Sequence, residues 1–363
     1  MGLNHRPRVA SVIASRAHRF TFVAKRLWRA CGMALALTIA VALPARGEVK
    51  TTDVWLDVDT ATGITDVDDG LMLIQCFHSP ELNVRGVSVV FGNTTLKRAV
   101  PIAEKIVARF GPRGLTVSPG AASAKDLGRE TPAASAIAAA LRERPLTILA
   151  VGPVTNIGTL VKLHPELHSR IERIVMVAAR RAGQRFVGGE KQRLPHRDFN
   201  FELDPTAMQV ILDTRIPLVF APWEVSSKLW INREDLAALA RTGGSGQWIA
   251  ETSAYWISLW EARITSRGFN PFDTLAAAWV THPQWIKAIR VEAHIEQAPD
   301  DRVAVDRGGD AKMKPYLVVR PCDAEGSREI LYCYEPKPEL KPMLLKRLSG
   351  SGSADSSAEA SSP

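Results

Sequence analysis

Cysteine is scarce in this sequence, with four residues in a chain of 363, which excludes a small disulfide-dense fold. Cys76 lies in an apolar helical stretch, where we expect it to be buried as a small hydrophobic residue. Cys322 and Cys333 flank the turn-like segment 323–327, so we expect them on the two strands of a hairpin, either paired or reduced. No Cys-x-x-Cys or Cys/His spacing indicates a zinc site.

The main part of the chain also lacks an excess of positive charge, although the whole sequence carries a formal charge of +8. Residues 1–47 contain eight Lys and Arg residues and no Asp or Glu, which accounts for the entire excess. The rest of the chain is balanced and has no basic footprint. The sequence therefore argues against a nucleic-acid partner.

Residues 1–47 have the pattern of an export leader. A basic region precedes the apolar run Met33–Leu43, and small residues follow within Pro44–Gly47, as at a cleavage site. An apolar run of this length is too short to span a bilayer, so no stable membrane association is expected. We expect a cleaved signal peptide and a periplasmic or secreted protein; a disordered basic extension is the alternative.

From residue 48 to residue 348, short β-rich runs alternate with helical ones and no internal repeat divides them. The expected strands are Val54–Val58, Val84–Phe91, Leu146–Val151, Ile171–Ala178 and Ile216–Ala221. The expected helices are Gly70–Phe77, Leu96–Phe110 and one that starts near Asn156. This order predicts one α/β domain with a mainly parallel, Rossmann-like twisted sheet, helices on both faces and ligands at the carboxyl ends of the strands. Residues 349–363 are rich in Ser, Ala and Gly, which predicts a disordered tail.

Carboxylates gather between residues 57 and 69. Asp57 and Asp59 are two residues apart at the end of the first strand, so their side chains share a face. Asp68 and Asp69 open the next helix, where the helix dipole favours negative charge, and we expect one of them to cap it. Unpaired carboxylates this close repel one another strongly. A hard divalent cation would relieve the repulsion, and oxygen ligands favour Ca²⁺ or Mg²⁺ over zinc.

Two other readings of this acidic stretch fit less well. A calcium-binding EF-hand loop requires a different spacing and a terminal Glu, whereas the residues after Gly70 are apolar. An aspartyl-phosphate phosphatase requires Asp-x-Asp-x-Thr after a strand, and Ala61 stands at the Thr position.

Five segments, in order along the chain, resemble the inosine–uridine-preferring nucleoside hydrolase family. Its signature, Asp-x-Asp-Pro-Gly-x-Asp-Asp, has four acids, which are matched here by Asp57, Asp59, Asp68 and Asp69, although the loop is longer and lacks the Pro. The other matching segments are Val89–Asn93, Ala150–Asn156, Asp198–Pro205 and Asn270–Asp273. The resemblance covers nearly all of residues 48–348.

The resemblance implies a glycosidase that uses Ca²⁺ to hydrolyse the N-glycosidic bond of ribonucleosides, releasing free base and ribose for nucleoside salvage. It implies metal ligation by the carboxylates of Asp59, Asp69 and Asp273 and by the backbone carbonyl of Val151. Asp59 would also be the general base that takes a proton from the attacking water. A homodimer or homotetramer is implied as well.

The same resemblance assigns the remaining matched residues. Ribose hydroxyls would be held by Asp68, Asn93 and Asn200, with turn formation as the alternative role of the two Asn residues. Asp198 would hold the 5′-hydroxyl, although it is one methylene shorter than the Glu of the family. Asp57 would orient neighbouring ligands from behind, and Thr155 and Asn156 are expected to cap the following helix.

The sequence departs from the family on the leaving-group side. Phe272 replaces a His that can protonate the departing base, and Val177 replaces a Met that lies against the ribose. His196 is a candidate replacement acid. We expect one tryptophan to meet the base, from the set Trp223, Trp230, Trp256 and Trp260. Base preference stays open.

Two other functions compete with nucleoside hydrolysis. A metal-dependent phosphohydrolase could use the same acidic turn, but it would need a cationic anchor for phosphate. A nucleoside- or ribose-binding protein with little turnover is the alternative that Phe272 favours.

Overall fold

The computed structural model describes residues 51–303, 311–322 and 328–350. The predictions for the leader 1–47 and for most of the tail 349–363 therefore lie outside the described residues. The described residues belong to one compact unit, which starts at Val49. None of the described helices is long and apolar enough to cross a membrane.

The described strands form one sheet in the order β3-β2-β1-β4-β5-β7-β10-β8-β9-β6. The neighbours from β3 to β7 are all parallel. These strands are β1 (Thr52–Val58), β2 (Leu82–Val89), β3 (Val117–Pro119), β4 (Leu146–Ala150), β5 (Ile171–Met176) and β7 (Leu218–Phe220). The prediction of a mainly parallel α/β sheet is confirmed.

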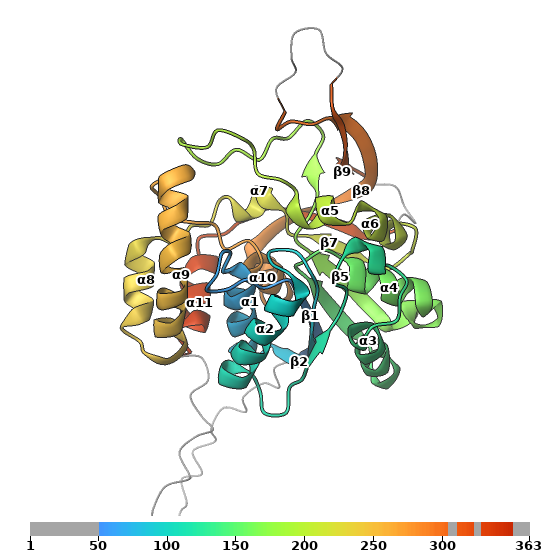
Figure 1. Ribbon diagram of the computed structural model, residues 1–363, viewed down its shortest axis with the longest axis horizontal. Coiled ribbons are helices and arrows are strands. Elements are labelled where there is room, and N and C mark those ends of the chain that lie inside the picture. The colour runs from blue at the N-terminus through green and yellow to red at the C-terminus, as the bar shows by residue number, and fades with distance from the viewer. Residues whose placement is uncertain (1–50, 304–310, 323–327, 351–363) are drawn as a thin grey trace, which may run out of the picture. The chain divides into compact units, whose positions relative to one another are not determined.

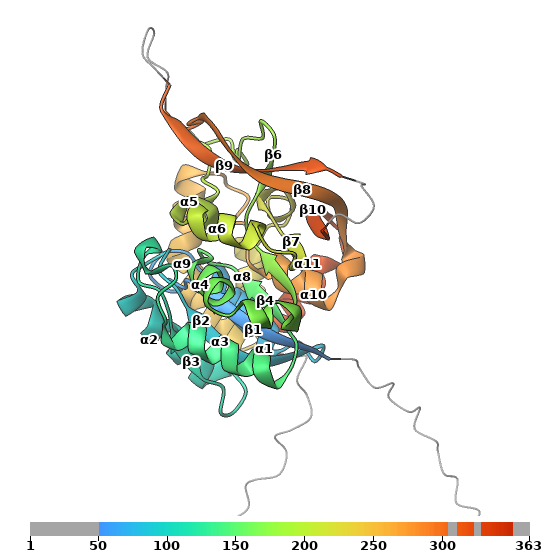
Figure 2. The ribbon, with the colours of Figure 1, turned by 90° about the vertical axis from the view of Figure 1, so that its right-hand side faces the viewer.

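The other edge of the sheet is mixed. The long strand β8 (Ile286–Pro299) runs antiparallel to both of its neighbours, β10 (Ile330–Pro336) and β9 (Met313–Pro321). The short strand β6 (Arg180–Arg181) joins β9 in parallel at the edge. As Figure 2 shows, β8 and β9 form a long ribbon that extends past the parallel strands.

Helices cover both faces of the parallel strands (Figure 1). On β1, Val54, Leu56 and Val58 point into one apolar core and Trp55 into the other, as the two-residue period of a doubly covered strand requires. The first core contains α1 (Asp68–Phe77), α2 (Leu96–Phe110), α8 (Arg233–Ala240), α9 (Gly244–Arg263), α10 (Thr274–Thr281) and α11 (Leu340–Leu348). The second contains α3 (Pro132–Glu143), α4 (Thr155–Leu163) and α6 (Pro205–Leu212).

The predicted hairpin around 323–327 is wrong. Cys322 follows β9 and Cys333 lies in β10, but β8 lies between these two strands in the sheet. Both cysteines are free thiols, and Cys333 is buried. The spacing of two strands along the chain could not reveal that an earlier strand separates them. Cys76 is buried in α1, as expected.

Candidate active site

The carboxyl ends of the parallel strands deliver the predicted site residues to one edge of the sheet. Asp59 follows β1, Asn93 follows β2, Val151 follows β4 and Val177 follows β5. A cavity of about 480 Å³ opens at this edge and is lined by Asn93, Val151 and Val177 among others. The location agrees with the rule that open α/β sheets bind ligands beyond their strand ends.

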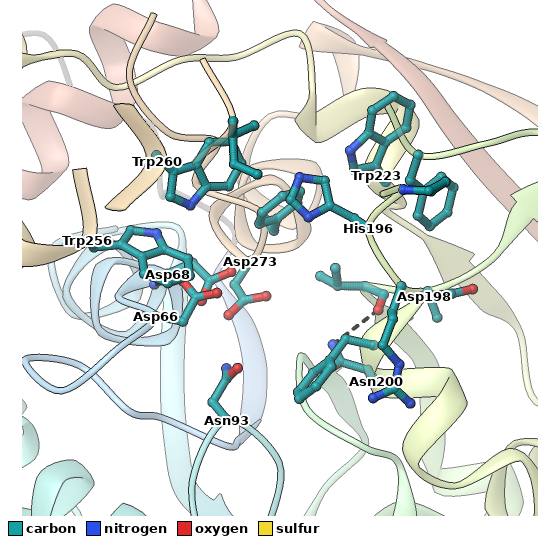
Figure 3. A pocket seen from close by; sticks show the side chains of 18 of the residues that line it. Asp66, Asp68, Asn93, His196, Asp198, Asn200, Trp223, Trp256, Trp260 and Asp273 are labelled. Carbon is teal, nitrogen blue, oxygen red and sulfur yellow. Dashed lines mark hydrogen bonds between the residues drawn. The ribbon is translucent and has the colours of Figure 1, made fainter. Parts of the chain in front are cut away.

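Three buried carboxylates form an acidic floor at the base of this pocket; Asp68 and Asp273 line the cavity directly, whereas Asp69, like Asp59, lies behind its surface. Asp68 and Asp69 begin α1, and Asp273 immediately precedes α10. One oxygen from each of these three lies within 4.8 Å of the others, and all three side chains are buried. Figure 3 shows Asp68 and Asp273 pointing toward each other, with Asp66 beside them. The helix starts thus place negative charge where the helix dipoles favour it.

Asp59 is tied to this floor by hydrogen bonds. Its backbone N–H donates to Asp69 Oδ1 at 3.0 Å, and its Oδ2 accepts the backbone N–H of Asn93 at 2.8 Å. The Asn93 side chain lies 3.4 Å from Asp59 Oδ1 and from Asp69 Oδ2. Asn93 therefore joins the end of β2 to the carboxylates of the β1–α1 loop.

The pKa values of these acids are raised because the groups are buried together. Burial raises the pKa of Asp59 to about 8, and the charges of Asp66 and Asp57 add to the shift. Burial and the charge of Asp69 raise the pKa of Asp68 to about 7. For Asp69 and Asp273 the pKa lies well above its usual value, from burial first and then from neighbouring carboxylates. Buried oxygen ligands that repel one another fit a hard divalent cation.

Asp57 lies behind the floor. It accepts hydrogen bonds from Ser88 Oγ at 2.5 Å and from Asn156 Nδ2 at 2.8 Å. Burial raises the pKa of Asp57 to about 7, while these two hydrogen bonds lower it. The expected capping of α4 by Thr155 and Asn156 is wrong. Thr155 Oγ1 donates instead to Asp204 at 2.5 Å, and Asn156 Nδ2 donates to Asp57.

Asp66 is a pocket residue to which the sequence reasoning gave no role. Its Oδ1 accepts the backbone N–H groups of Val67 at 2.8 Å and Asp68 at 3.4 Å, and it lines the cavity. Neither Asp68 nor Asp69 is the N-cap residue of α1, which is Val67; Asp68 Oδ1 does accept the backbone N–H of Asp69 at 3.1 Å. The extra length of the loop brings this additional carboxylate to the start of α1.

The opposite side of the floor carries amide and carboxylate groups. Asn200, in α5 (Phe199–Leu203), donates from Nδ2 to the Val151 carbonyl at 2.6 Å and to the Val177 carbonyl at 3.2 Å. Asp198 Oδ2 accepts the backbone N–H of Ala179 at 2.9 Å. Ala179 has a φ of +81°, which is rare for a residue with a side chain and often marks a functional position. Asp198 and Asn200 both line the cavity.

Burial also shifts the pKa of Asp198. Its side chain is 5% exposed, and desolvation raises its pKa to about 7 although the charge of Arg180 lowers it. The carboxylate form is therefore costly in the absence of a ligand.

An aromatic wall faces the acidic floor (Figure 3). Trp223, Trp256, Trp260 and Phe272 all line the cavity. Trp230 does not line it; its ring lies edge-on to Trp260 with centroids 6.1 Å apart. Flat apolar rings opposite polar groups are a typical arrangement for a heteroaromatic ligand.

His196 belongs to this wall. Its ring stacks on Trp260 at a centroid distance of 5.4 Å and meets Phe272 edge-on at 6.4 Å. Burial, and then the charge of Arg302, lowers the pKa of His196 to about 4, so the imidazole is neutral at physiological pH. Three arginines, Arg197, Arg263 and Arg302, also line the cavity, and none of them lies in the sequence motifs of the family.

A mainly parallel α/β sheet whose strand ends hold buried carboxylates beneath an aromatic wall defines an enzyme-like, small-molecule-binding class of fold and site. Within that class, the chain belongs to the inosine-uridine preferring nucleoside hydrolase family, whose family model matches residues 54–329. The resemblance predicted from the five segments is confirmed.

Curated relatives and solved structures agree with this membership. The chain is 29% identical over 203 residues to the pyrimidine-specific ribonucleoside hydrolase RihA of Citrobacter koseri, covering 48% of this chain and 63% of the relative. It is 29% identical over 195 residues to the RihA of Escherichia coli O7:K1, covering 46% of this chain and 60% of the relative. These matches thus span less than two thirds of each relative.

The same fold occurs in solved nucleoside hydrolases. A plant nucleoside hydrolase, PpNRh1, matches with a TM-score of 0.65 at 18% identity, covering 82% of this chain and 99% of that one. The purine-preferring ribonucleoside hydrolase of Gardnerella vaginalis matches with a TM-score of 0.65 at 17% identity, covering 83% and 99%. At these identities the likeness establishes the fold alone.

Proposed function

We propose that this protein is a nucleoside N-ribohydrolase, which cleaves ribonucleosides with water to give free base and ribose. The observation that carries the proposal is the pocket itself. In a chain of the nucleoside hydrolase family, one cavity combines buried carboxylates, two Asn side chains and an aromatic wall. Polar groups on one side suit a sugar, and flat rings on the other suit a base.

The proposed cofactor is Ca²⁺. The carboxylates of Asp59, Asp69 and Asp273 and the carbonyl of Val151 would hold it, because these buried oxygens match the preference of this ion. Bound Ca²⁺ would acidify water and orient sugar hydroxyls. Asp68 shares the floor with Asp69 and Asp273, so it lies close enough to serve both the ion and the ribose.

Asp59 is the proposed general base. Its carboxylate is oriented by the Asn93 N–H and is fixed next to Asp69, so it can accept the proton of a water molecule that attacks the anomeric carbon. Cleavage of a glycosidic bond develops positive charge on the sugar ring. The surrounding carboxylates are placed to stabilise that charge.

The proposed ribose contacts come from both sides of the floor. Asp68, Asn93 and Asn200 would bind ring hydroxyls, and Asp198 would bind the 5′-hydroxyl. Each of the two Asn side chains is already oriented by hydrogen bonds to its neighbours. Asp57, held by Ser88 and Asn156, would support the floor from behind.

The base would lie against the aromatic wall, with Trp260 at its centre. Three of the four tryptophans selected from the sequence line the cavity. The similar proteins are described as pyrimidine-specific in one case and purine-preferring in another. We therefore propose a ribonucleoside substrate and leave the base to be identified by assay.

The test is release of reducing sugar from a panel of purine and pyrimidine ribonucleosides, with EDTA and after adding back Ca²⁺ or Mg²⁺. The proposal expects ribose release that EDTA abolishes and Ca²⁺ restores. Release of phosphate from phosphate esters, without ribose, would support a phosphohydrolase. Tight ribose binding without release would support a binding protein.

We also propose that the protein is exported and acts in nucleoside salvage in the periplasm or outside the cell, because residues 1–47 have a leader pattern. Fractionation of cells that express the full chain, compared with a chain lacking residues 2–47, tests this. A homodimer or homotetramer is proposed from family resemblance, and light scattering of the purified protein tests it.

A further inference from the structure

The pocket contains one partly buried arginine that has no charged partner among the described residues. Of the three arginines that line the cavity, Arg197 forms an ion pair with Glu202 at 2.8 Å, and Arg263 is exposed at the end of α9. The guanidinium of Arg302 makes no hydrogen bond or ion pair with the residues that the structure describes, and its Nε is buried. A buried donor without a partner is costly unless a ligand satisfies it.

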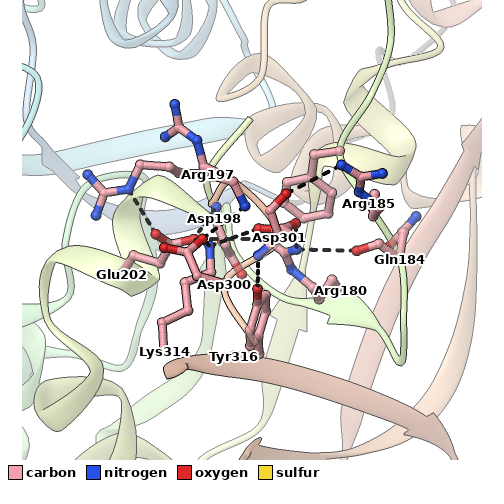
Figure 4. Close-up of polar contacts among 12 residues, drawn as sticks. Arg180, Gln184, Arg185, Arg197, Asp198, Glu202, Asp300, Asp301, Lys314 and Tyr316 are labelled. Atoms are coloured by element: carbon pink, nitrogen blue, oxygen red, sulfur yellow. Dashed lines mark hydrogen bonds and ion pairs between the residues drawn. The ribbon is translucent and has the colours of Figure 1, made fainter. Parts of the chain in front are cut away.

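Arg302 lies in a turn of residues 300–303 that directly follows β8 and is closed by the hydrogen bond from the Val303 N–H to the Asp300 carbonyl at 3.2 Å. Its backbone N–H donates to Asp300 Oδ1 at 3.0 Å. The next residue back, Asp301, forms ion pairs with Arg180 at 3.2 Å and with Lys314 at 3.1 Å. Arg180 is 2% exposed, so this ion-pair cluster is largely shielded from water and anchors the turn to the body of the protein (Figure 4).

A second contact anchors the same turn. The Asp301 backbone N–H donates to the Tyr316 hydroxyl at 2.9 Å, and that hydroxyl donates to the Pro299 carbonyl at 2.8 Å. Residues 300–303 are therefore tied to both β8 and β9. A rigid support of this kind presents a side chain to a pocket without a large entropic cost on binding.

Arg302 lines the same cavity as His196 and the other rings of the aromatic wall. Its charge acts on His196, whose ring stacks on Trp260 and meets Phe272. These rings are the surface against which a planar base would lie. A guanidinium beside them can donate N–H groups to carbonyl or ring-nitrogen acceptors of that base.

We propose that Arg302 contacts the departing base and stabilises the negative charge that develops on it as the N-glycosidic bond breaks. This inference rests on the proposed nucleosidase function. Phe272 has no proton to give and His196 is neutral, whereas a guanidinium stays charged throughout the working pH range. A fixed cation at the site of developing negative charge lowers the barrier without a proton transfer.

The bonds and protons of the proposed step balance. The bond between the anomeric carbon and the base nitrogen breaks, and its electron pair stays on the base. The oxygen of a water molecule bonds to the anomeric carbon, and one proton of that water passes to Asp59. The base leaves as an anion paired with Arg302 and then takes a proton from solvent, while Asp59 returns its proton to solvent.

Leaving-group dependence tests the proposal. Turnover of ribonucleosides is compared with turnover of p-nitrophenyl β-D-ribofuranoside, whose leaving group is stable as an anion. The variants are Arg302→Met, Arg302→Lys and the control Arg320→Met, which changes an exposed arginine of β9 outside the pocket. Thermal unfolding of each variant checks that it is folded.

Arg302→Met is expected to lower kcat on nucleosides about 100-fold, the usual loss for one charge-stabilising donor, with a much smaller change in KM. Its turnover of the p-nitrophenyl riboside should stay within about 3-fold, and Arg302→Lys should recover part of the nucleoside loss because it keeps the charge. Equal losses on both substrates, or no loss on nucleosides, would overturn the proposal. A wild-type protein that cleaves neither substrate would overturn the nucleosidase function, and the role of Arg302 with it.

Discussion

Single carboxylates of the candidate site contact several neighbours at once, and Asp59, beside the acidic floor, is the clearest case. It accepts from Asn93, donates its backbone N–H to Asp69 and is surrounded by other buried acids. Changing it should therefore affect both ion binding and proton transfer. Replacing Asp59 by Asn separates these effects from changes in packing, because the Asn amide has the same shape as the Asp carboxylate.

Asp59→Asn is expected to lower kcat by roughly 10² to 10⁴, the range for loss of a general base. It should also weaken Ca²⁺ binding, because one negative ligand is removed. Steady-state kinetics at saturating Ca²⁺ and isothermal titration of the ion measure the two effects. Turnover close to wild type at saturating Ca²⁺ would remove Asp59 from the role of base.

The raised pKa of Asp198 predicts that the stability of the folded protein depends on pH. Burial raises its pKa from 3.8 in the unfolded chain to about 7 in the folded protein, so the folded state prefers the protonated form. The resulting stabilisation is complete below pH 3.8 and is lost as the pH rises through about 7. Asp198→Asn is neutral throughout, so its stability relative to wild type should increase with pH.

The expected difference in unfolding free energy between Asp198→Asn and wild type grows by up to about 4 kcal/mol between pH 4 and pH 8, from 1.36 kcal/mol per pKa unit. Urea unfolding at several pH values, without nucleoside, measures it. Asp213→Asn, at an exposed site after α6, is the matched control and should show no such trend. A constant difference for Asp198→Asn across this range would contradict the assignment.

At the residue scale, the sequence predicted those residues of the site that lie in short sequence motifs. Asp59, Asp68 and Asp69 are close in the chain, and Asp273 was reachable only through a motif some 200 residues later. Asp66 and Arg302 were not predicted. Asp66 lies in a loop whose length differs from the family signature, and Arg302 is brought into the pocket by ion pairs between distant segments that no local pattern reveals.

At the scale of elements, the backbone segments that follow β2 and β4 lie very close to the Asp59 side chain. A Cβ added to Gly92, after β2, would collide with the Asp59 carboxylate. The backbone at Gly152, after β4, is also close, and a Cβ there would lie 2.8 Å from the Val90 side chain and 2.9 Å from Asp59 Cβ. Both positions therefore require glycine for reasons of space.

Gly92→Ala is expected to displace Asp59 and to lower kcat about 100-fold, the cost of a misplacement near 1 Å. Gly114→Ala is the control. Gly114 also has a positive φ, of +79°, but nothing lies within 4 Å of an added Cβ, so that variant should lose about 1 kcal/mol of stability and keep its turnover. Steady-state kinetics and thermal unfolding of both variants measure turnover and stability. A Gly92→Ala enzyme with the turnover of wild type would contradict the packing argument.

The elements differ in how well the sequence predicted them. Buried parallel strands are continuous apolar runs, and β1, β2, β4, β5 and β7 begin and end within two residues of their predicted bounds. Helix α2 has the predicted bounds, Leu96–Phe110. By contrast, β8 mixes exposed charged residues with half-buried ones, which weakens its apolar signal. Its position between β9 and β10 depends on tertiary packing, which a local sequence pattern does not reveal.

At the scale of the whole molecule, removing the proposed Ca²⁺ should expose the mutual repulsion of the acidic floor. EDTA is expected to lower the unfolding temperature, and Ca²⁺ at 100 times its Kd to restore about 2.7 kcal/mol of stability. Differential scanning calorimetry measures the change. Asp273→Asn is the matched variant and should respond less to Ca²⁺; an identical response from wild type and variant would place the ion elsewhere.

The central claim is that this pocket splits the bond between ribose and base with water. Its most direct test is quantitative chromatography of the products from each ribonucleoside in a panel, with purified protein and Ca²⁺. The account predicts free base and ribose in equal amounts from at least one nucleoside, with both products abolished by EDTA or by Asp59→Asn. Intact nucleosides throughout the panel, despite bound Ca²⁺ and a folded protein, would contradict it.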